Sequence, residues 1–105
     1  MNYTFLSSLY ENIPDIPPDS ILSRTVYSDD QVKVVLFGFA QGQELSEHTA
    51  STPAIIHILK GEARILLGSD SFVGPPQTWI HMPANLPHSI YAKSTLYMLL
   101  YLLKS

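Results

Sequence analysis

The amino-acid sequence predicts an all-β fold, and two features of the 105-residue chain support this prediction. The first is the number of chain-breaking residues, because eight prolines and five glycines leave little room for helices. The second is the composition of the short stretches between them, which are rich in the Ile, Val, Leu, Thr and Tyr that strands favour. Short strands at regular spacing predict a β-sandwich or β-barrel in a single domain.

Residues 1–19 differ from the rest of the chain. They hold prolines at positions 14, 17 and 18 among polar neighbours, so we expect an irregular or briefly helical arm. This arm is expected to pack Phe5, Leu6 and Leu9 against the body. Residues 20–105 are expected to form the β domain. Its strands are predicted at residues 21–27, 32–39, 54–59, 63–67, 78–82, 89–92 and 96–103.

Two connections between these strands can be assigned from their turn residues. Gly61 lies between two apolar runs, and glycine readily adopts the positive φ that a tight hairpin connection needs. Segment 82–88 forms the second turn, because Pro83 presets one turn position and Asn85 tolerates the left-handed region. This second turn delivers His88 to the start of a strand.

Residues 96–103 form a strongly apolar run. Eight residues are too few to cross a membrane as a helix, which takes about 20 residues, so the run is expected to lie in the core. Its periodicity alone also fits a buried helix. The alternation of Tyr97 and Leu99 with Met98 favours a strand that is buried on both faces.

The charge balance argues against two classes of partner. Six Lys and Arg residues against nine Asp and Glu residues give a net charge of −3, and the basic residues are scattered singly. Without a basic patch, neither nucleic acid nor a membrane surface is an expected partner. Charged residues make up only 14% of the chain, and 46% is hydrophobic. Since typical soluble domains are about 25% charged, this composition favours self-association, and we expect a homodimer.

The chain has no cysteine, which excludes disulfides, thiolate metal sites and thiol nucleophiles. Any metal must therefore be bound by histidine, carboxylate or amide groups. Residues 1–9 lack the basic and long apolar stretches of a signal peptide, so we expect a cytoplasmic protein. The histidines available for chemistry are His48, His57, His81 and His88.

Gly42, His48 and Gly61 fall into the register of a known motif. Their spacing resembles the first signature of the cupin superfamily, in which a glycine precedes a His-x-His pair, a glutamate follows and a second glycine closes a hairpin. Segment 83–88, Pro-Ala-Asn-Leu-Pro-His, resembles the second signature, Pro-x-Gly-x-x-His, with Asn85 in place of the glycine. The rhythm of the expected strands is also similar to that of small single-domain cupins. The resemblance implies a double-stranded β-helix, or jelly-roll, barrel.

The resemblance also implies a metal site, which this sequence matches only in part. In cupins, the first motif supplies two histidines and a glutamate, and the second motif supplies one histidine, to a single divalent metal. Here His48 and His88 occupy two of these positions, whereas Ala50 and Ala54 stand in place of the other two ligands. Because catalytic metal sites usually offer three protein ligands, such a degenerate motif predicts weak binding of Fe, Ni, Zn or Mn.

Strand alternation bears on whether another histidine completes the ligand set. If Ala54 faces inward, His57 faces the opposite side and lies outside the cavity unless a bulge intervenes. His81 shares a face with Trp79, but the period of two does not fix which face is inward. We therefore include His81 as a third candidate metal ligand, after the two motif histidines.

Two functional hypotheses follow from the sequence. The first is a small cupin barrel that binds a small organic ligand, with a weak histidine-bound divalent metal. Ala50 and Ala54 favour this hypothesis because they remove coordinating atoms and widen an apolar cavity. The second is a metal-dependent cupin enzyme of the dioxygenase, isomerase or decarboxylase type that acts on a small molecule. This range is implied by the resemblance, and the residues do not narrow it.

Overall fold

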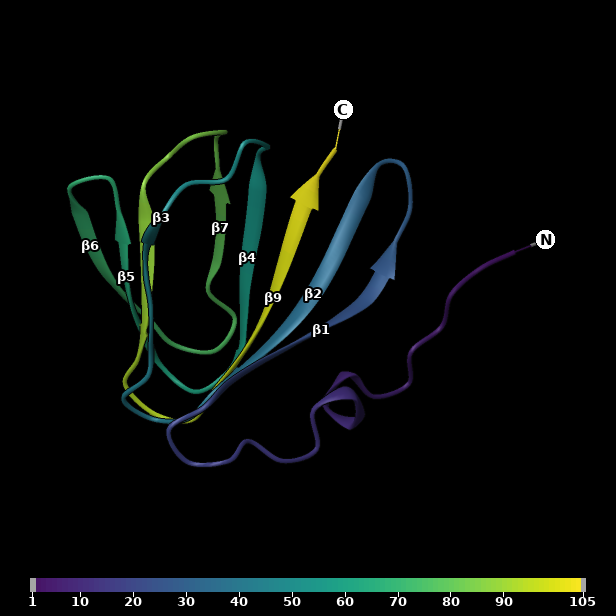
Figure 1. Cartoon of the computed structure of the whole chain (residues 1–105), viewed down its shortest axis with the longest axis horizontal. Coiled ribbons are helices and arrows are strands. Elements are labelled where there is room, and N and C mark those ends of the chain that lie inside the picture. Colours follow the sequence, from purple (N-terminus) through teal and green to yellow (C-terminus); the bar gives the residue numbers. More distant parts are fainter. Residues whose placement is uncertain (1, 105) are drawn as a thin grey trace.

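The computed structural model describes residues 2–104 and consists almost entirely of strands in two antiparallel sheets (Figure 1). The larger sheet has the strand order β1-β2-β9-β4-β7, and the smaller sheet has the order β3-β8-β5-β6. The all-β fold class predicted from the sequence is confirmed. Within residues 2–104, no helix has the length and apolar character needed to cross a membrane. The elements are η1 (Leu9–Asn12), β1 (Ile21–Ser28), β2 (Val32–Phe39), β3 (Glu44–His48), β4 (Ala54–Lys60), β5 (Ala63–Leu67), β6 (Asp70–Gly74), β7 (Trp79–Met82), β8 (His88–Ala92) and β9 (Leu96–Leu103).

Each of the strands expected from the sequence is present, with ends that agree to within one residue. Two further strands, β3 and β6, were not predicted. Both lie at the edges of the smaller sheet, and nearly all of their side chains are exposed or half-buried. An edge strand with so little buried surface does not need the apolar alternation by which strands are recognised in a sequence.

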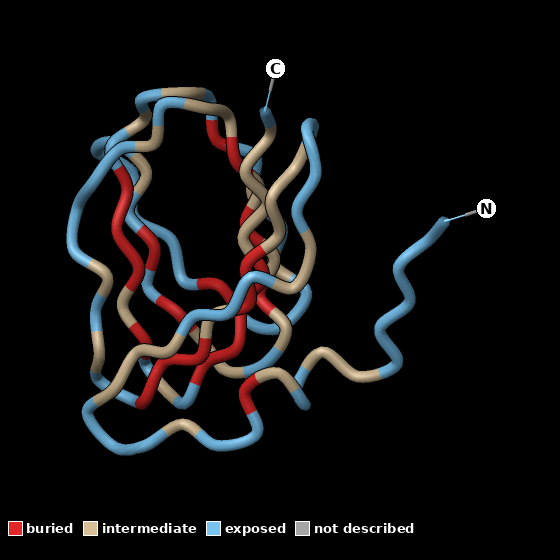
Figure 2. The backbone as a smooth tube through the Cα atoms, turned by 45° about the vertical axis from the view of Figure 1, so that its right-hand side comes forward, coloured by how far each residue is buried: buried red, intermediate tan, exposed pale blue. Residues whose placement is uncertain are grey.

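The main core lies between the two sheets and takes residues from both. On β4, Ala54, Ile56 and Ile58 are buried and alternate with less buried neighbours, as expected for a strand with one inward face. Figure 2 shows the buried residues concentrated in the strands, while residues 2–7 at the N-terminal end are exposed. The fully packed members of this core are Phe39, Ala54, Ile56, Ile58, Ala63, Ile65, Met82, Ile90, Ala92, Leu96 and Met98.

A second apolar cluster covers the opposite face of the larger sheet. Leu36 and Leu99 face each other across β2 and β9, and Ile13 from the N-terminal segment packs against them. The Tyr97 hydroxyl donates a hydrogen bond to the Ile13 carbonyl at 2.8 Å, and burial raises the pKa of Tyr97. β9 is therefore buried on both faces over its first half, which confirms the interpretation of this apolar run as a core strand.

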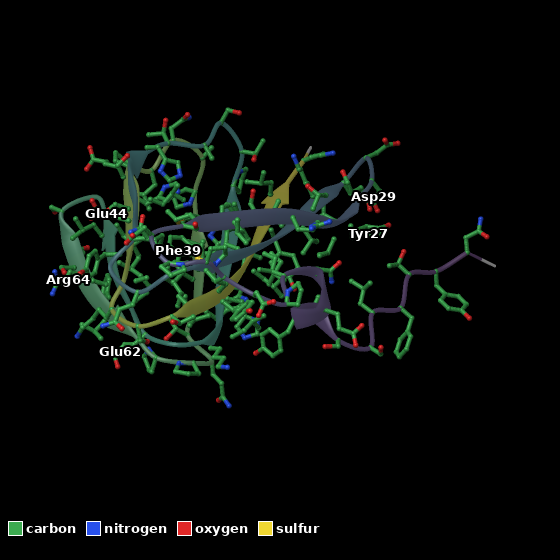
Figure 3. All side chains as sticks on the ribbon, turned by 60° about the horizontal axis from the view of Figure 1, so that its bottom comes forward. Tyr27, Asp29, Phe39, Glu44, Glu62 and Arg64 are labelled. Carbon is green, nitrogen blue, oxygen red and sulfur yellow. The ribbon has the colours of Figure 1, made fainter. Side chains whose placement is uncertain are left out.

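The tip of the β1–β2 hairpin is organised by the Asp29 carboxylate (Figure 3). One oxygen accepts hydrogen bonds from the backbone N–H groups of Gln31 and Val32, at 2.8 and 2.9 Å. The other accepts a hydrogen bond from the Tyr27 hydroxyl at 2.6 Å. Hydrogen bonds to the ionised form, that from Tyr27 first, lower the pKa of Asp29, and the same bond raises the pKa of Tyr27.

This turn should make stability depend on pH at the acid end. Because the folded-state pKa of Asp29 is depressed, its contribution is present above the ordinary carboxyl pKa and is lost as pH falls through the lowered value. We expect Asp29→Asn to lower the melting temperature at neutral pH, and the difference from the wild type to shrink toward zero in acid. Thermal denaturation followed by circular dichroism across this range measures both, with Asp30→Asn as the matched control. A difference in melting temperature that stays constant down to acid pH would contradict the role given to the ionised Asp29 carboxylate.

Candidate functional site

His48 and His88 lie side by side on the paired strands β3 and β8. They are register partners, and their ring centroids are 4.2 Å apart with an angle of 58° between the planes. His88 is only 5% exposed, whereas the His48 side chain is open to solvent. The prediction that folding brings these two imidazoles together is confirmed. We refer to them as the histidine pair.

An irregularity in β3 makes this pairing possible. Leu45 faces Ile90 and His48 faces His88, so two residues of β3, at positions 46 and 47, lie opposite one residue of β8, at position 89. In regular β3, an odd separation would place Leu45 and His48 on opposite faces of the strand. The extra residue absorbs that mismatch, as β-bulges do, and allows both side chains to face the same side as Ile90 and His88.

The two loops that carry the cupin-like motifs are joined by a backbone contact. Asn85 adopts the positive φ of 67° that was predicted for it. In this conformation its N–H group donates a hydrogen bond of 2.7 Å to the carbonyl of Ala50, in the connection between β3 and β4. This hydrogen bond connects the turn before His88 to the segment after His48. It therefore helps to keep the two histidines next to each other.

Each ring of the pair is oriented by a backbone carbonyl two residues before it in the chain. His48 Nδ1 lies 2.7 Å from the carbonyl oxygen of Ser46, and His88 Nδ1 lies 2.9 Å from that of Leu86. A carbonyl oxygen can only accept, so in both rings the Nδ1 atom carries the hydrogen that is donated. In the neutral rings both Nε2 atoms therefore present lone pairs, which can accept a hydrogen bond or ligate a metal.

An apolar pocket of about 270 Å³ lies between the smaller sheet and β7, and it is connected to the histidine pair through one lining residue. Its lining includes Leu67, which is the register partner of His88 on β5, and the fully buried Ile65, through which it reaches the main core. Residues 63, 65 and 67 alternate with exposed neighbours, so Leu67 shares the inward face with His88. The lining residues are Ile65, Leu67, Phe72, Val73, Gly74, Thr78, Trp79 and Ile80.

This chain matches no protein-family model and no curated protein, but it is similar to several solved structures. A cupin superfamily protein from Desulfitobacterium hafniense has a TM-score of 0.82 at 28% identity, covering 87% of this chain and 84% of that one. A conserved protein of unknown function from Streptococcus pyogenes has a TM-score of 0.85 at 28% identity, covering 100% and 91%. A Cupin 2 conserved barrel domain protein from Leptotrichia buccalis has a TM-score of 0.83 at 25% identity, covering 91% of this chain and 46% of that one. This chain has the fold of a small cupin domain.

The donor atoms of this cupin domain fit a divalent metal only in part. Ala54 is buried on the inner face of β4, and Ala50 lies in the loop before it, where the cupin motif would place two further ligands. Methyl groups cannot coordinate a metal. Within residues 2–104, no three His, Asp or Glu side chains are arranged to hold a metal ion. The histidine pair supplies two imidazoles, which fit a weakly held ion and fall short of the three ligands of a catalytic site.

The other two histidines of the cupin domain lie away from the pair. His57 is half-buried, faces away from its inward neighbours Ile56 and Ile58, and pairs with Leu99 of the second cluster, as its parity predicted. His81 is exposed and lies next to the buried Met82, so it points to the outer side of β7. We therefore remove His81 from the candidate site. Sequence alone could not do this, because the period of two leaves the absolute face open.

Two features of the candidate site, the carbonyl groups that orient the rings and the apolar pocket, were not identified from the sequence. The carbonyls of Ser46 and Leu86 orient the rings. Any residue type has a backbone carbonyl, so contacts of this kind cannot be recognised from the amino-acid sequence. The apolar pocket was missed because β6 was not predicted, although the adjacent Phe72 and Val73 were a signal for it. Glu44 pairs with Tyr91 and is exposed at the periphery (Figure 3), so it is not aimed at the histidine pair.

Proposed function

We propose that this cupin domain binds a small organic molecule, with the apolar pocket holding its body and the histidine pair holding its polar group. The observation that carries the proposal is the orientation of the pair, in which two neighbouring rings each have Nδ1 engaged by the backbone. The two Nε2 lone pairs form a polar contact beside a surface that is otherwise apolar. Ligand pockets usually combine an apolar lining with a few placed polar groups.

The pocket sets the size and character of the molecule. A volume of about 270 Å³ is slightly below the 300–1,000 Å³ typical of small-molecule sites, so it suits a compact ligand. Cross-strand neighbours have Cβ atoms about 5 Å apart, which puts the side chain of Leu67 within reach of the His88 ring. A ring or short branched chain bearing one hydroxyl or amine group therefore matches the arrangement.

The donor set favours binding over metal-dependent catalysis. A cupin enzyme of dioxygenase, isomerase or decarboxylase type would need its metal held firmly, and Ala50 and Ala54 remove two of the expected ligands. The histidine pair supports instead a weakly bound divalent ion, with open positions left for water or for the ligand. We propose no catalytic residue for this chain.

The chain contains one tryptophan, Trp79, which lines the pocket and reports on its occupancy by fluorescence. We expect cyclohexanol to shift the Trp79 emission to the blue in a saturable manner. His88→Leu keeps the volume of a buried side chain but removes Nε2, and should weaken cyclohexanol about fivefold, the effect of one hydrogen bond. Thr25→Leu, an exposed position on β1 at the opposite edge of the larger sheet from β7, is the control and should leave the affinity unchanged.

A second probe separates the pocket from the histidine pair. Methoxycyclohexane has the same ring but no hydroxyl to donate, so its binding should be indifferent to His88→Leu. If the Trp79 emission responds to neither compound, the proposal that this pocket binds a small organic molecule is wrong. Equal losses for both compounds in His88→Leu would show that His88 supports the pocket without contacting the polar group.

A further inference from the structure

The first residues of the described chain project away from the body and carry large apolar side chains. Figure 1 shows the N-terminal segment leaving the sheets beyond η1 and running outward. Tyr3 is 81% exposed and Phe5 is 78% exposed, and Leu6 next to them is also exposed. The prediction that Phe5 packs against the body is therefore wrong, whereas Leu9 does pack, against the second apolar cluster. Of the described part of the N-terminal arm predicted at residues 1–19, only residues 2–8 project in this way, and from here on the arm means residues 2–8. Exposure of two aromatic side chains on one short segment is unfavourable, because burial of apolar surface contributes about 25 cal/mol of free energy for each Å².

The arm starts from a fixed point on its own domain. Ile13 is buried against the larger sheet, its carbonyl accepts the Tyr97 hydroxyl hydrogen bond, and the Tyr10 ring packs edge to face on Tyr97 at 4.8 Å. From this anchorage the seven residues of the arm can extend about 23 Å. The exposed aromatic residues therefore lie within reach of a neighbouring molecule, while the chain from residue 9 onward stays in place.

The outer face of the larger sheet offers an apolar surface that the arm only partly covers. A pocket of about 430 Å³ lies between this face and the arm, lined on the sheet side by Val26, Val34, Leu99 and Tyr101. Strand register extends the same face sideways, because Tyr101 pairs with Ile55 and Leu99 pairs with His57. On β4 these rows carry no Lys, Arg, Asp or Glu side chain, whereas on the other side the Leu99 row continues through Leu36 to the exposed Arg24 of β1. We refer to these two rows and the pocket as the outer face.

We propose that two copies of this chain associate through their outer faces, with Tyr3 and Phe5 of each arm packing on the outer face of the other copy. Exchange of identical arms is reciprocal under a two-fold axis, so each aromatic contact is made twice. Both surfaces are mainly apolar. Arg24 lies at the β1 edge of the outer face and is exposed, so its long side chain can keep the guanidinium in water and no charge has to be buried without a partner.

The area that such an exchange would bury is sufficient for a stable dimer. An aromatic side chain buries about 150–250 Å², so two on each arm and two arms contribute about 600–1,000 Å². The sheet surface that they cover adds a similar area, which brings the total to about 1,200–2,000 Å². Specific protein interfaces bury this amount. The low charge content of the chain, 14%, is consistent with a surface that is hidden in this way.

Sedimentation velocity on the full chain tests the proposal. We expect the wild type to be a dimer at micromolar concentration, and the double variant Tyr3→Ser with Phe5→Ser to raise the dissociation constant at least about a hundredfold. Phe72→Ser is the matched control, because Phe72 is also an exposed aromatic residue, at 51%, but lies on β6 of the smaller sheet. A monomeric wild type, or a dimer that survives the double variant, would overturn the proposal.

A crosslinking experiment identifies the surface independently of stability. Since the chain has no cysteine, the variants Phe5→Cys and Tyr101→Cys each carry a single thiol. We expect a mixture of the two, one bearing a size tag, to form the mixed disulfide on mild oxidation, and a mixture of Phe72→Cys with Tyr101→Cys to form none. Formation of the mixed disulfide by the control pair alone would place the contact elsewhere and refute the exchange.

Discussion

Replacing Gly61 with alanine is expected to lower the free energy of unfolding by about 3–5 kcal/mol, among the largest effects that a single substitution produces. Gly61 adopts a φ of +87° in the hairpin between β4 and β5. A Cβ atom on it would lie 2.1 Å from the backbone oxygen of Thr95, just before β9 begins. The clash is with backbone, so it cannot be relieved by a side-chain rotation, and β4 or β9 would have to shift.

Gly42 provides a matched control for this substitution. It has the same φ of +87°, but a Cβ atom added there would meet nothing within 4 Å. Gly42→Ala should therefore cost only the penalty of a left-handed non-glycine residue, about 1–2 kcal/mol. The difference between the two variants isolates the close approach to Thr95 from the backbone strain that they share.

Urea denaturation followed by circular dichroism measures both losses. For a domain of this size each kcal/mol corresponds to about 4–8 °C in melting temperature, so heating distinguishes the variants as well. A folded domain typically has only 5–15 kcal/mol of stability, and failure of Gly61→Ala to fold while Gly42→Ala folds would agree with the prediction. Equal losses in the two variants would contradict it.

The sequence was most informative where backbone geometry or burial restricts the choice of residue. Gly61 and Asn85 were assigned positive φ values from their turn context, and both have them. Residues 96–103 were assigned to a strand buried on both faces, and β9 occupies the centre of the larger sheet. Strands β3 and β6 escaped prediction because edge strands bury little, so few of their positions are required to be apolar.

The candidate site could be predicted only as far as motif spacing and parity allow. The approach of His48 and His88 followed from the resemblance, and the outward direction of His57 followed from alternation with Ala54. The outward direction of His81 could not be predicted, because a strand pattern shows only which residues share a face. Tertiary packing decides which face is inside. The irregularity in β3 that turns His48 toward His88 likewise depends on pairing with β8, which is not encoded locally.

Metal binding is the second prediction with a large expected effect, and the four histidines of this chain allow it to be read residue by residue. We expect Zn²⁺ added near neutral pH to shift the ring signals of His48 and His88 in nuclear magnetic resonance spectra. The signals of His57 and His81 should stay in place, because these rings lie on the outer side of the larger sheet. They serve as controls within the same molecule.

Removal of either imidazole of the pair should nearly abolish this response. Loss of a group that merely orients a metal ligand typically lowers affinity 10–100-fold, so loss of one of two ligands should cost at least about tenfold. His48→Ala tests this without disturbing the core, because His48 is exposed, whereas His88→Leu tests the buried partner. His81→Ala should leave the affinity unchanged. Shifts confined to His81, or an affinity indifferent to His48→Ala, would show that the pair is not the metal site.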